Sequence, residues 1–207
     1  MKYGQMSWGQ TEALVNKVGG LEGVQKVLSG EWIVGTPIEM KQVEKTVDKI
    51  LKRLGKLTID CPAHNPQSGF WKIGTGLWVD SALAPILQAA ESLPAGPVSF
   101  NRHLIEKDGG ALDSEIRAKG AGLKVKHAYT PGQFLQLAQT LIEAQPKGSA
   151  GTLLNTGKAN IFYVLCGGVV FTVRVRWHRL SGRWRVGVWQ FDDRRWNVGS
   201  QVFSPAT

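Results

Sequence analysis

The sequence is poor in cysteine and has no long apolar run. Its 207 residues include two cysteines, Cys61 and Cys166. A disulfide framework needs more cysteines than this, so a reducing compartment is expected. No stretch of about 18 apolar residues is present, so no membrane-spanning helix is expected. The first residues contain no apolar segment of the kind found in secretory signals, and we therefore expect a cytoplasmic protein.

Acidic side chains are outnumbered by basic ones. Lys and Arg number 25 and Asp and Glu number 16, which gives a formal net charge of +9. This excess favours association with polyanions, but it does not separate DNA, RNA and acidic protein partners. Apolar residues make up 43% of the chain, too many for a mostly disordered protein. At about 150 residues per domain, the length predicts one or two domains.

The motifs of common catalytic and cofactor sites are missing. The chain has no phosphate loop of the Gly-x-x-x-x-Gly-Lys-Ser/Thr type, no Gly-x-Gly-x-x-Gly motif and no Gly-x-Ser-x-Gly elbow. Cys61 and His64 have the spacing of half a zinc site, but the sequence supplies no second half. We therefore expect no metal ion and no cofactor, and a binding protein is favoured over an enzyme.

Helix start signals dominate the first part of the chain. Residues 36–39, Thr-Pro-Ile-Glu, combine a capping threonine, a proline in the first turn and a glutamate that reaches back. They predict a helix that runs to about residue 54. Shorter helices are predicted at residues 11–18 and 21–28. Together these helices form a predicted N-terminal unit of residues 1–55.

The signals between residues 56 and 159 are mixed. A capping box at residues 130–133, with proline at the first helical position, predicts a helix that ends before Pro146. Residues 58–79 are rich in Pro, Gly and Asn and predict a long loop. The other predicted elements are helices at residues 81–93 and 111–119 and strands at residues 98–105 and 123–129.

From residue 160 onward the sequence alternates in the manner of β-strands. The four predicted strands cover residues 161–165, 169–178, 183–191 and 196–203. Gly167-Gly168 joins the first two and is typical of hairpin turns. Sequential strands with tight turns predict a four-stranded antiparallel meander over residues 160–203. Because helices come first and the sheet last, we predict an α+β protein with helices on one face of this sheet, in a domain of residues 56–207.

Alternation along two of these strands gathers cations on one side of the sheet. Arg174, Arg176 and His178 share a face of the second strand, and Arg183 and Arg185 share a face of the third. Valine and tryptophan occupy the opposite face, which is expected to pack against helices. Like charges opposite each other destabilise a sheet, so a compensating anion is expected.

The compensating anion has two possible sources. Phosphates of an external polyanion would bind the arginines, with Trp189 stacking on bases. Alternatively, acidic side chains of the protein itself would neutralise the face, and the candidates are Glu106, Asp108, Asp113 and Glu115. We predict a non-catalytic module that binds nucleic acid or another polyanion. An adaptor for an acidic protein partner is an alternative, and the oligomeric state stays open.

A second alternative is a small, metal-independent ribonuclease. A chain with helices first and a sheet carrying His and Arg last resembles, at the level of fold, small ribonucleases such as barnase and the toxin ribonucleases. Such enzymes need a general base, a general acid and cations at the phosphate. The resemblance implies His103 or His178 as acid–base residues and Arg176 and Arg185 as phosphate ligands.

Two segments resemble parts of a family of uncharacterised bacterial proteins. The stretch from Asn16 to Glu31, NKVGGLEGVQKVLSGE, resembles an N-terminal module that occurs with differing C-terminal parts. The stretch from Trp196 to Pro205, WNVGSQVFSP, resembles the C-terminal tail of the same proteins. The resemblance implies a bacterial, cytosolic protein with a separable N-terminal part, and it assigns no activity or site.

Overall fold

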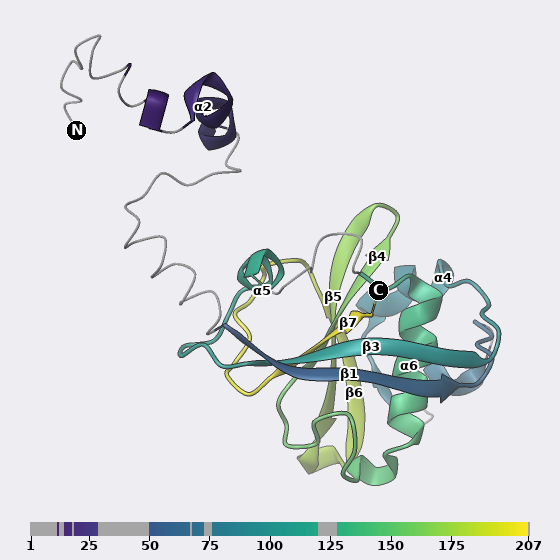
Figure 1. Ribbon diagram of the computed structural model, residues 1–207. Helices are drawn as coiled ribbons and strands as arrows, with labels where there is room; N and C mark the ends of the chain where they lie inside the picture. The colour runs from purple at the N-terminus through teal and green to yellow at the C-terminus, as the bar shows by residue number, and fades with distance from the viewer. Residues whose placement is uncertain are drawn as a thin grey trace. The chain divides into compact units, whose positions relative to one another are not determined.

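The chain divides into two units, residues 1–45 and residues 46–207, whereas the sequence predicted the boundary near residue 55. The computed structural model describes residues 12, 15–17, 19–28, 50–66, 68–72, 76–119 and 128–206. In the first unit this part contains helix α2 (Gly20–Leu28) (Figure 1), which confirms the helix predicted at residues 21–28.

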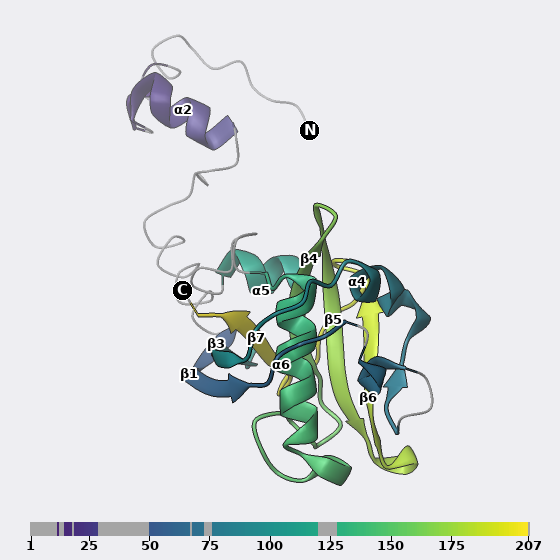
Figure 2. The ribbon, with the colours of Figure 1, turned by 90° about the vertical axis from the view of Figure 1, so that its right-hand side faces the viewer.

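The described residues of the second unit form a seven-stranded mixed sheet (Figure 1, Figure 2). Its strands are β1 (Leu51–Cys61), β2 (Trp78–Val79), β3 (Gly96–Ile105), β4 (Asn160–Cys166), β5 (Val169–His178), β6 (Arg183–Trp189) and β7 (Gln201–Pro205). Their order is β1-β3-β7-β4-β5-β6-β2. The pairs β4–β7 and β2–β6 are parallel, and the other neighbours are antiparallel. Figure 1 shows β1 and β3 crossing β5 and β6 at a large angle, so the sheet is strongly twisted.

Short helices complete the described part of this unit. They are α4 (Ala84–Gln88), α5 (Asp113–Lys119) and α6 (Pro131–Glu143), with 3-10 turns η1 (Gly69–Trp71), η2 (Ser81–Leu83), η4 (Pro146–Gly148) and η5 (Arg179–Ser181). The strand predicted at residues 98–105 and the helix predicted at 111–119 are confirmed by β3 and α5. The helix predicted at 81–93 is shorter than expected, since α4 ends at Gln88. Of the strand predicted at 123–129, residues 123–127 lie outside the described part of the chain.

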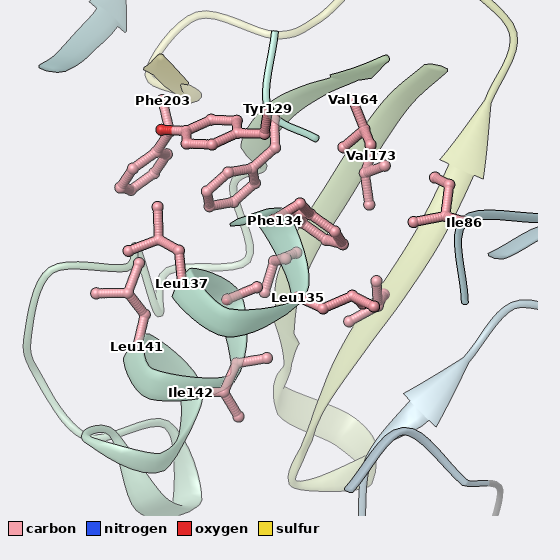
Figure 3. Packing of buried hydrophobic residues seen from close by; sticks show 14 of the residues in the cluster. Ile86, Tyr129, Phe134, Leu135, Leu137, Leu141, Ile142, Val164, Val173 and Phe203 are labelled. Atoms are coloured by element: carbon pink, nitrogen blue, oxygen red, sulfur yellow. The ribbon is translucent and has the colours of Figure 1, made fainter. Parts of the chain in front are cut away.

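Helix α6 begins where its capping signal predicts. The Thr130 hydroxyl accepts a hydrogen bond from the backbone N–H of Gln133 at 3.3 Å, and the Gln133 side chain accepts one from the Thr130 N–H at 3.1 Å. This capping box satisfies two N–H groups that the first turn leaves without partners. The buried side of α6 packs Phe134 and Leu137 toward Phe203 of β7 in the main core (Figure 3).

The other face of the sheet carries a second core with a buried carboxylate. Ile116 of α5 packs there against residues of β4 and β7. Asp113 Oδ1 accepts hydrogen bonds from the Tyr163 hydroxyl at 2.9 Å and the Trp196 indole N–H at 2.7 Å. Asp113 Oδ2 accepts one from the backbone N–H of Asp192 at 3.0 Å. Burial raises the pKa of the Asp113 carboxyl, while these hydrogen bonds act in the opposite direction.

The predicted four-stranded antiparallel meander with helices on one face is wrong. Strands β4, β5 and β6 form its first three strands, but residues 196–203 do not supply a fourth beside β6. The chain leaves the sheet after β6 because Trp196 pairs through its backbone with Ala111. It returns as β7 between β3 and β4, parallel to β4. Helices α5 and α6 cover opposite faces of the sheet, so the protein is α+β with a seven-stranded mixed sheet in its described part.

The helix predicted at residues 36–54 is wrong at its C-terminal end. Its last four residues begin β1, and the residues before position 50 lie outside the described part. From Leu57 to Cys61 the apolar residues alternate with a period of two, which is the strand period. Gly55, expected to end the helix, has a φ of 114° and lies at a register shift between β1 and β3. It therefore marks a β-bulge.

We expect Asp113→Asn to lower the free energy of unfolding by about 1–3 kcal/mol, because an amide offers one acceptor oxygen to three donors. Thermal unfolding followed by circular dichroism measures the effect. Asp108→Asn is the control, since Asp108 is exposed in the turn before α5. An unchanged melting temperature for Asp113→Asn would show that the carboxylate does not hold this core together.

Candidate anion-binding surface

The register of β5 and β6 places the predicted cations on one side of the sheet. Arg176 lies directly opposite Arg185, His178 lies opposite Arg183, and Arg174 lies opposite Gly187. The predicted alternation of these two strands is confirmed. Arg174, Arg176, Arg183 and Arg185 are called the arginine face below.

The arginine face is held in place by the apolar side chains behind it. Val173, Val175 and Val186 are fully buried and belong to the main core under α6. Arg174 pairs across the sheet with Ile161 of β4, which belongs to the second core. The arginine face is thus a continuation of the layer that α5 covers.

The structure adds to the four arginines of this face a fifth guanidinium group, Arg194, and an aromatic ring, Trp78, that the sequence did not predict. Arg194, from the segment after β6, lies 5.4 Å from the centroid of the Trp189 ring, and Arg174 lies 4.1 Å from the same centroid. On the other side, Arg185 lies 5.7 Å from the centroid of Trp78, its partner on β2. No local pattern marks Arg194 or the two-residue strand β2. Pairing with β6 brings β2 here, and contact with the Trp189 ring holds Arg194 here.

Gly187 makes room for this arrangement. A Cβ atom at Gly187 would lie 2.6 Å from a ring carbon of Trp189, so the indole ring lies over the glycine. Since Gly187 is opposite Arg174, the ring also reaches that guanidinium. Trp189 contacts Arg174, Arg194 and the Trp196 ring, whose centroid is 6.0 Å away. Trp189 therefore contacts cations of the protein itself, and its stacking on bases stays a prediction.

Arg174, Arg176, Arg185 and Arg194 form an arginine cluster in which positive charges repel one another. Each of these four has a buried Nε atom without a hydrogen-bond partner in the described part of the protein. Burial lowers the pKa of Arg174 to about 10, and repulsion from the other three guanidinium groups adds to this effect. Asp80, which continues from β2, raises the Arg174 pKa and supplies a nearby negative charge. An additional anion would stabilise this cluster.

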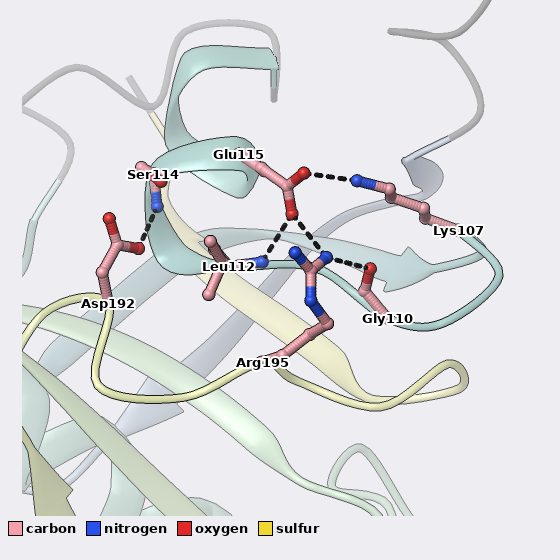
Figure 4. Close-up of polar contacts among 7 residues, drawn as sticks. All are labelled: Lys107, Gly110, Leu112, Ser114, Glu115, Asp192 and Arg195. Atoms are coloured by element: carbon pink, nitrogen blue, oxygen red, sulfur yellow. Dashed lines mark hydrogen bonds and ion pairs between the residues drawn. The ribbon is translucent and has the colours of Figure 1, made fainter.

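The acidic residues proposed to neutralise the arginine face have other partners. Glu106 lies 3.5 Å from Lys52 on β1. Asp113 is buried in the second core, and Asp108 is exposed in a turn. Glu115 forms an ion pair with Lys107 and a second ion pair with Arg195 (Figure 4). In the second pair, Arg195 Nη1 donates a hydrogen bond to Glu115 Oε2 at 2.9 Å. The partners of Glu106, Asp113 and Glu115 are thus residues other than the four arginines of the arginine cluster.

The two candidate catalytic histidines lie far apart. His103 is buried on β3 beside Arg53, and burial followed by repulsion from Arg53 lowers its pKa. Pairing across β7 and β4 aligns His103 with Arg174 on β5, three strands away. His178 lies four residues further along β5, so the two histidines are about 20 Å apart.

His178 also has a local structural role. Its Nδ1 accepts a hydrogen bond from the backbone N–H of Ser181 at 3.3 Å and caps η5. Desolvation and the neighbouring Arg185, Arg176 and Arg183 lower its pKa, which opposes the protonated form that a general acid requires. Sequence reasoning placed both histidines on the sheet but did not predict their separation.

No protein-family model, curated protein or solved structure matches this chain. Within the described residues, no group of three or more His, Cys, Asp or Glu side chains is arranged to hold a metal ion. No helix in the same part of the chain has the length and apolar character needed to cross a membrane.

Glu115 predicts a specific pH dependence of stability. Its hydrogen bonds with Lys107 and Leu112 lower its pKa to about 2. Because this value is below that of an unfolded glutamate, the stabilisation is fully present above about pH 4.5 and is lost as the pH falls toward 2. We expect Glu115→Gln to cost about 1 kcal/mol at pH 7, since the side chain is partly exposed, and to cost little near pH 2.

Urea unfolding at pH 7, 4 and 2.5 measures this difference. Glu106→Gln is the matched control, because its ion pair with Lys52 is longer and both side chains are largely exposed. A loss of stability in Glu115→Gln that is the same at all three pH values would contradict the assignment of the low pKa to Glu115.

Proposed function

We propose that this protein is a non-catalytic module that binds nucleic acid through phosphate contacts to the arginine face. The observation that carries the proposal is the arginine cluster, in which four guanidinium groups have unpartnered buried Nε atoms. Their terminal nitrogens are the donors for an incoming phosphate, and bound phosphate would offset the repulsion among them. Asp80 supplies one negative charge against four positive ones.

The extent of the surface favours a polyanion over a small ion. Arg183 lies opposite His178, which is four residues along β5 from Arg174. The face therefore extends about 13 Å along the strands from Arg174 to Arg183. Arg194 extends the charge further, beyond the end of β6. A single small anion reaches one or two of these guanidinium groups, whereas successive phosphates of a nucleic acid reach several.

The aromatic rings favour nucleic acid over an acidic protein. Trp78 and Trp189 alternate with the guanidinium groups of Arg185 and Arg174 across the face. Positive charge interleaved with aromatic rings is the combination that binds nucleic-acid backbones and bases together. A binding role is favoured over ribonuclease activity because His103 and His178 lie too far apart to act on one phosphate.

The test is a titration of fluorescein-labelled DNA and RNA oligonucleotides with the full chain at 50 and 200 mM salt. If four guanidinium groups contact phosphate, affinity should fall about 50-fold over this range for a single strand and about 150-fold for a DNA duplex. Arg176→Glu/Arg185→Glu should weaken binding and flatten the salt dependence. These two positions face each other, so the variant keeps a like-charge pair of the same kind.

Lys56→Glu/Lys147→Glu is the matched control, because it changes net charge equally at exposed positions outside the arginine face. Its affinity should be much closer to that of the wild type than the affinity of Arg176→Glu/Arg185→Glu. Absence of binding at 50 mM salt would overturn the proposal and leave an acidic protein as the partner to seek. The RNA is run on a gel after the titration, and cleaved RNA would overturn the non-catalytic assignment.

A further inference from the structure

We infer that the ligand of the arginine face is a single strand, with unpaired bases stacking on Trp78 and Phe191 at two sides of the arginine cluster. The inference rests on the proposed function. It goes further, because it assigns the bases, and not only the phosphates, to particular side chains. It also separates single-stranded nucleic acid from a duplex.

Trp78 and Phe191 are the aromatic members of the exposed large apolar side chains in the described residues. Their exposed fractions are 38% and 36%. By contrast, Trp196 is buried, and Trp189 is less exposed, with guanidinium groups from two arginines against its ring. A base approaching the arginine cluster therefore finds accessible ring surface at Trp78 and Phe191.

The two rings lie on either side of the cluster. Trp78 pairs with Arg185 at the β2 edge of the sheet. The ring of Phe191 lies 6.3 Å from Tyr163 of β4, measured between centroids. Strands β6 and β5 lie between β2 and β4, which is about 14 Å across the sheet. Tyr163 also lies four residues along β4 from the row that contains Trp78, Arg185 and Arg176, so Trp78 and Tyr163 are about 20 Å apart.

Each exposed ring has a guanidinium group beside it. Arg185 lies 5.7 Å from the centroid of Trp78, and Arg117 lies 5.5 Å from the centroid of Phe191. A single exposed aromatic residue on a protein surface is common and needs no functional explanation. Here two such rings lie on either side of the arginine cluster, and each lies next to a cation. Each ring with its guanidinium group can stack on a base and bind a phosphate, so the same combination occurs twice.

Base stacking on these rings requires unpaired bases. In a duplex, the flat faces of each base are covered by the neighbouring base pairs, so an exposed ring gains nothing from them. In a single strand these faces are available, and stacking does not depend on base identity. At about 3.4 Å per stacked nucleotide, the separation of about 20 Å corresponds to about six nucleotides.

The experiment compares four probes with the full chain at 50 mM salt. They are a fluorescein-labelled 12-mer of deoxythymidine, the matching ribouridine 12-mer, a labelled 12-base-pair DNA duplex, and inorganic polyphosphate as an unlabelled competitor without bases. The single strands should bind more tightly than the duplex. The deoxythymidine and ribouridine probes distinguish a DNA ligand from an RNA ligand.

Trp78→Ala should weaken single-strand binding about fivefold or more, and Trp78→Phe should retain most of the affinity because it keeps a ring. Phe191→Ala should have an effect of the same kind. Neither alanine variant should change competition by polyphosphate or the salt dependence, because no phosphate ligand is lost. Val169→Ala is the control, since Val169 is 57% exposed at the opposite end of β5, and it should bind like the wild type.

The inference is overturned if the duplex binds as tightly as the single strands, or if Trp78→Ala and Phe191→Ala both stay within twofold of the wild type. It is also overturned if these variants weaken polyphosphate competition equally. If neither polyphosphate nor any oligonucleotide binds, the proposed function itself has failed. Salt-sensitive binding of polyphosphate and duplex without an effect of the ring variants would remove the single-strand inference alone.

Discussion

The pairing of β5 with β6 is the interaction on which the candidate surface depends. It sets Arg176 opposite Arg185, a like-charge contact that costs up to about 1 kcal/mol. On the other side of the same strands, Val175 faces Val186 in the main core. Burying each valine side chain contributes about 1.5 kcal/mol or more, so the core outweighs the repulsion. A slip by one residue would exchange the two faces, which is why this register is strongly specified.

The aromatic rings determine how the crowded cations are arranged. Trp189 lies over Gly187 and contacts Arg174 and Arg194, and cation–π attraction of about 0.5–2 kcal/mol per contact partly offsets the repulsion. The guanidinium groups are thereby ordered before a ligand arrives. Less side-chain entropy is then lost on binding, so more of the phosphate interaction contributes to affinity.

The segment between β6 and β7 connects the core to the candidate surface. Asp113 accepts hydrogen bonds from the Trp196 side chain and the Asp192 backbone, which anchors this segment to α5. The two anchored residues, Asp192 and Trp196, lie on either side of Arg194 in the sequence, and Phe191 directly precedes Asp192. Close by, the backbone of Trp196 pairs with Ala111 outside the sheet, and the chain then returns as β7 between β3 and β4. One buried carboxylate thus holds the segment that carries two proposed ligand contacts, Phe191 and Arg194.

Local sequence by itself determined the features that depend on neighbouring residues. The alternation in β5 and β6 predicted the shared face of Arg174, Arg176 and Arg185, and the capping box predicted the start of α6, because both signals act within a few residues. Tertiary structure alone decided the strand order, the bulge at Gly55 and the approach of Trp78 and Arg194 to this face. These features depend on pairing between segments that are distant in sequence. The apolar spacing at the start of β1 also fits the helical period, and only pairing with β3 made this segment a strand.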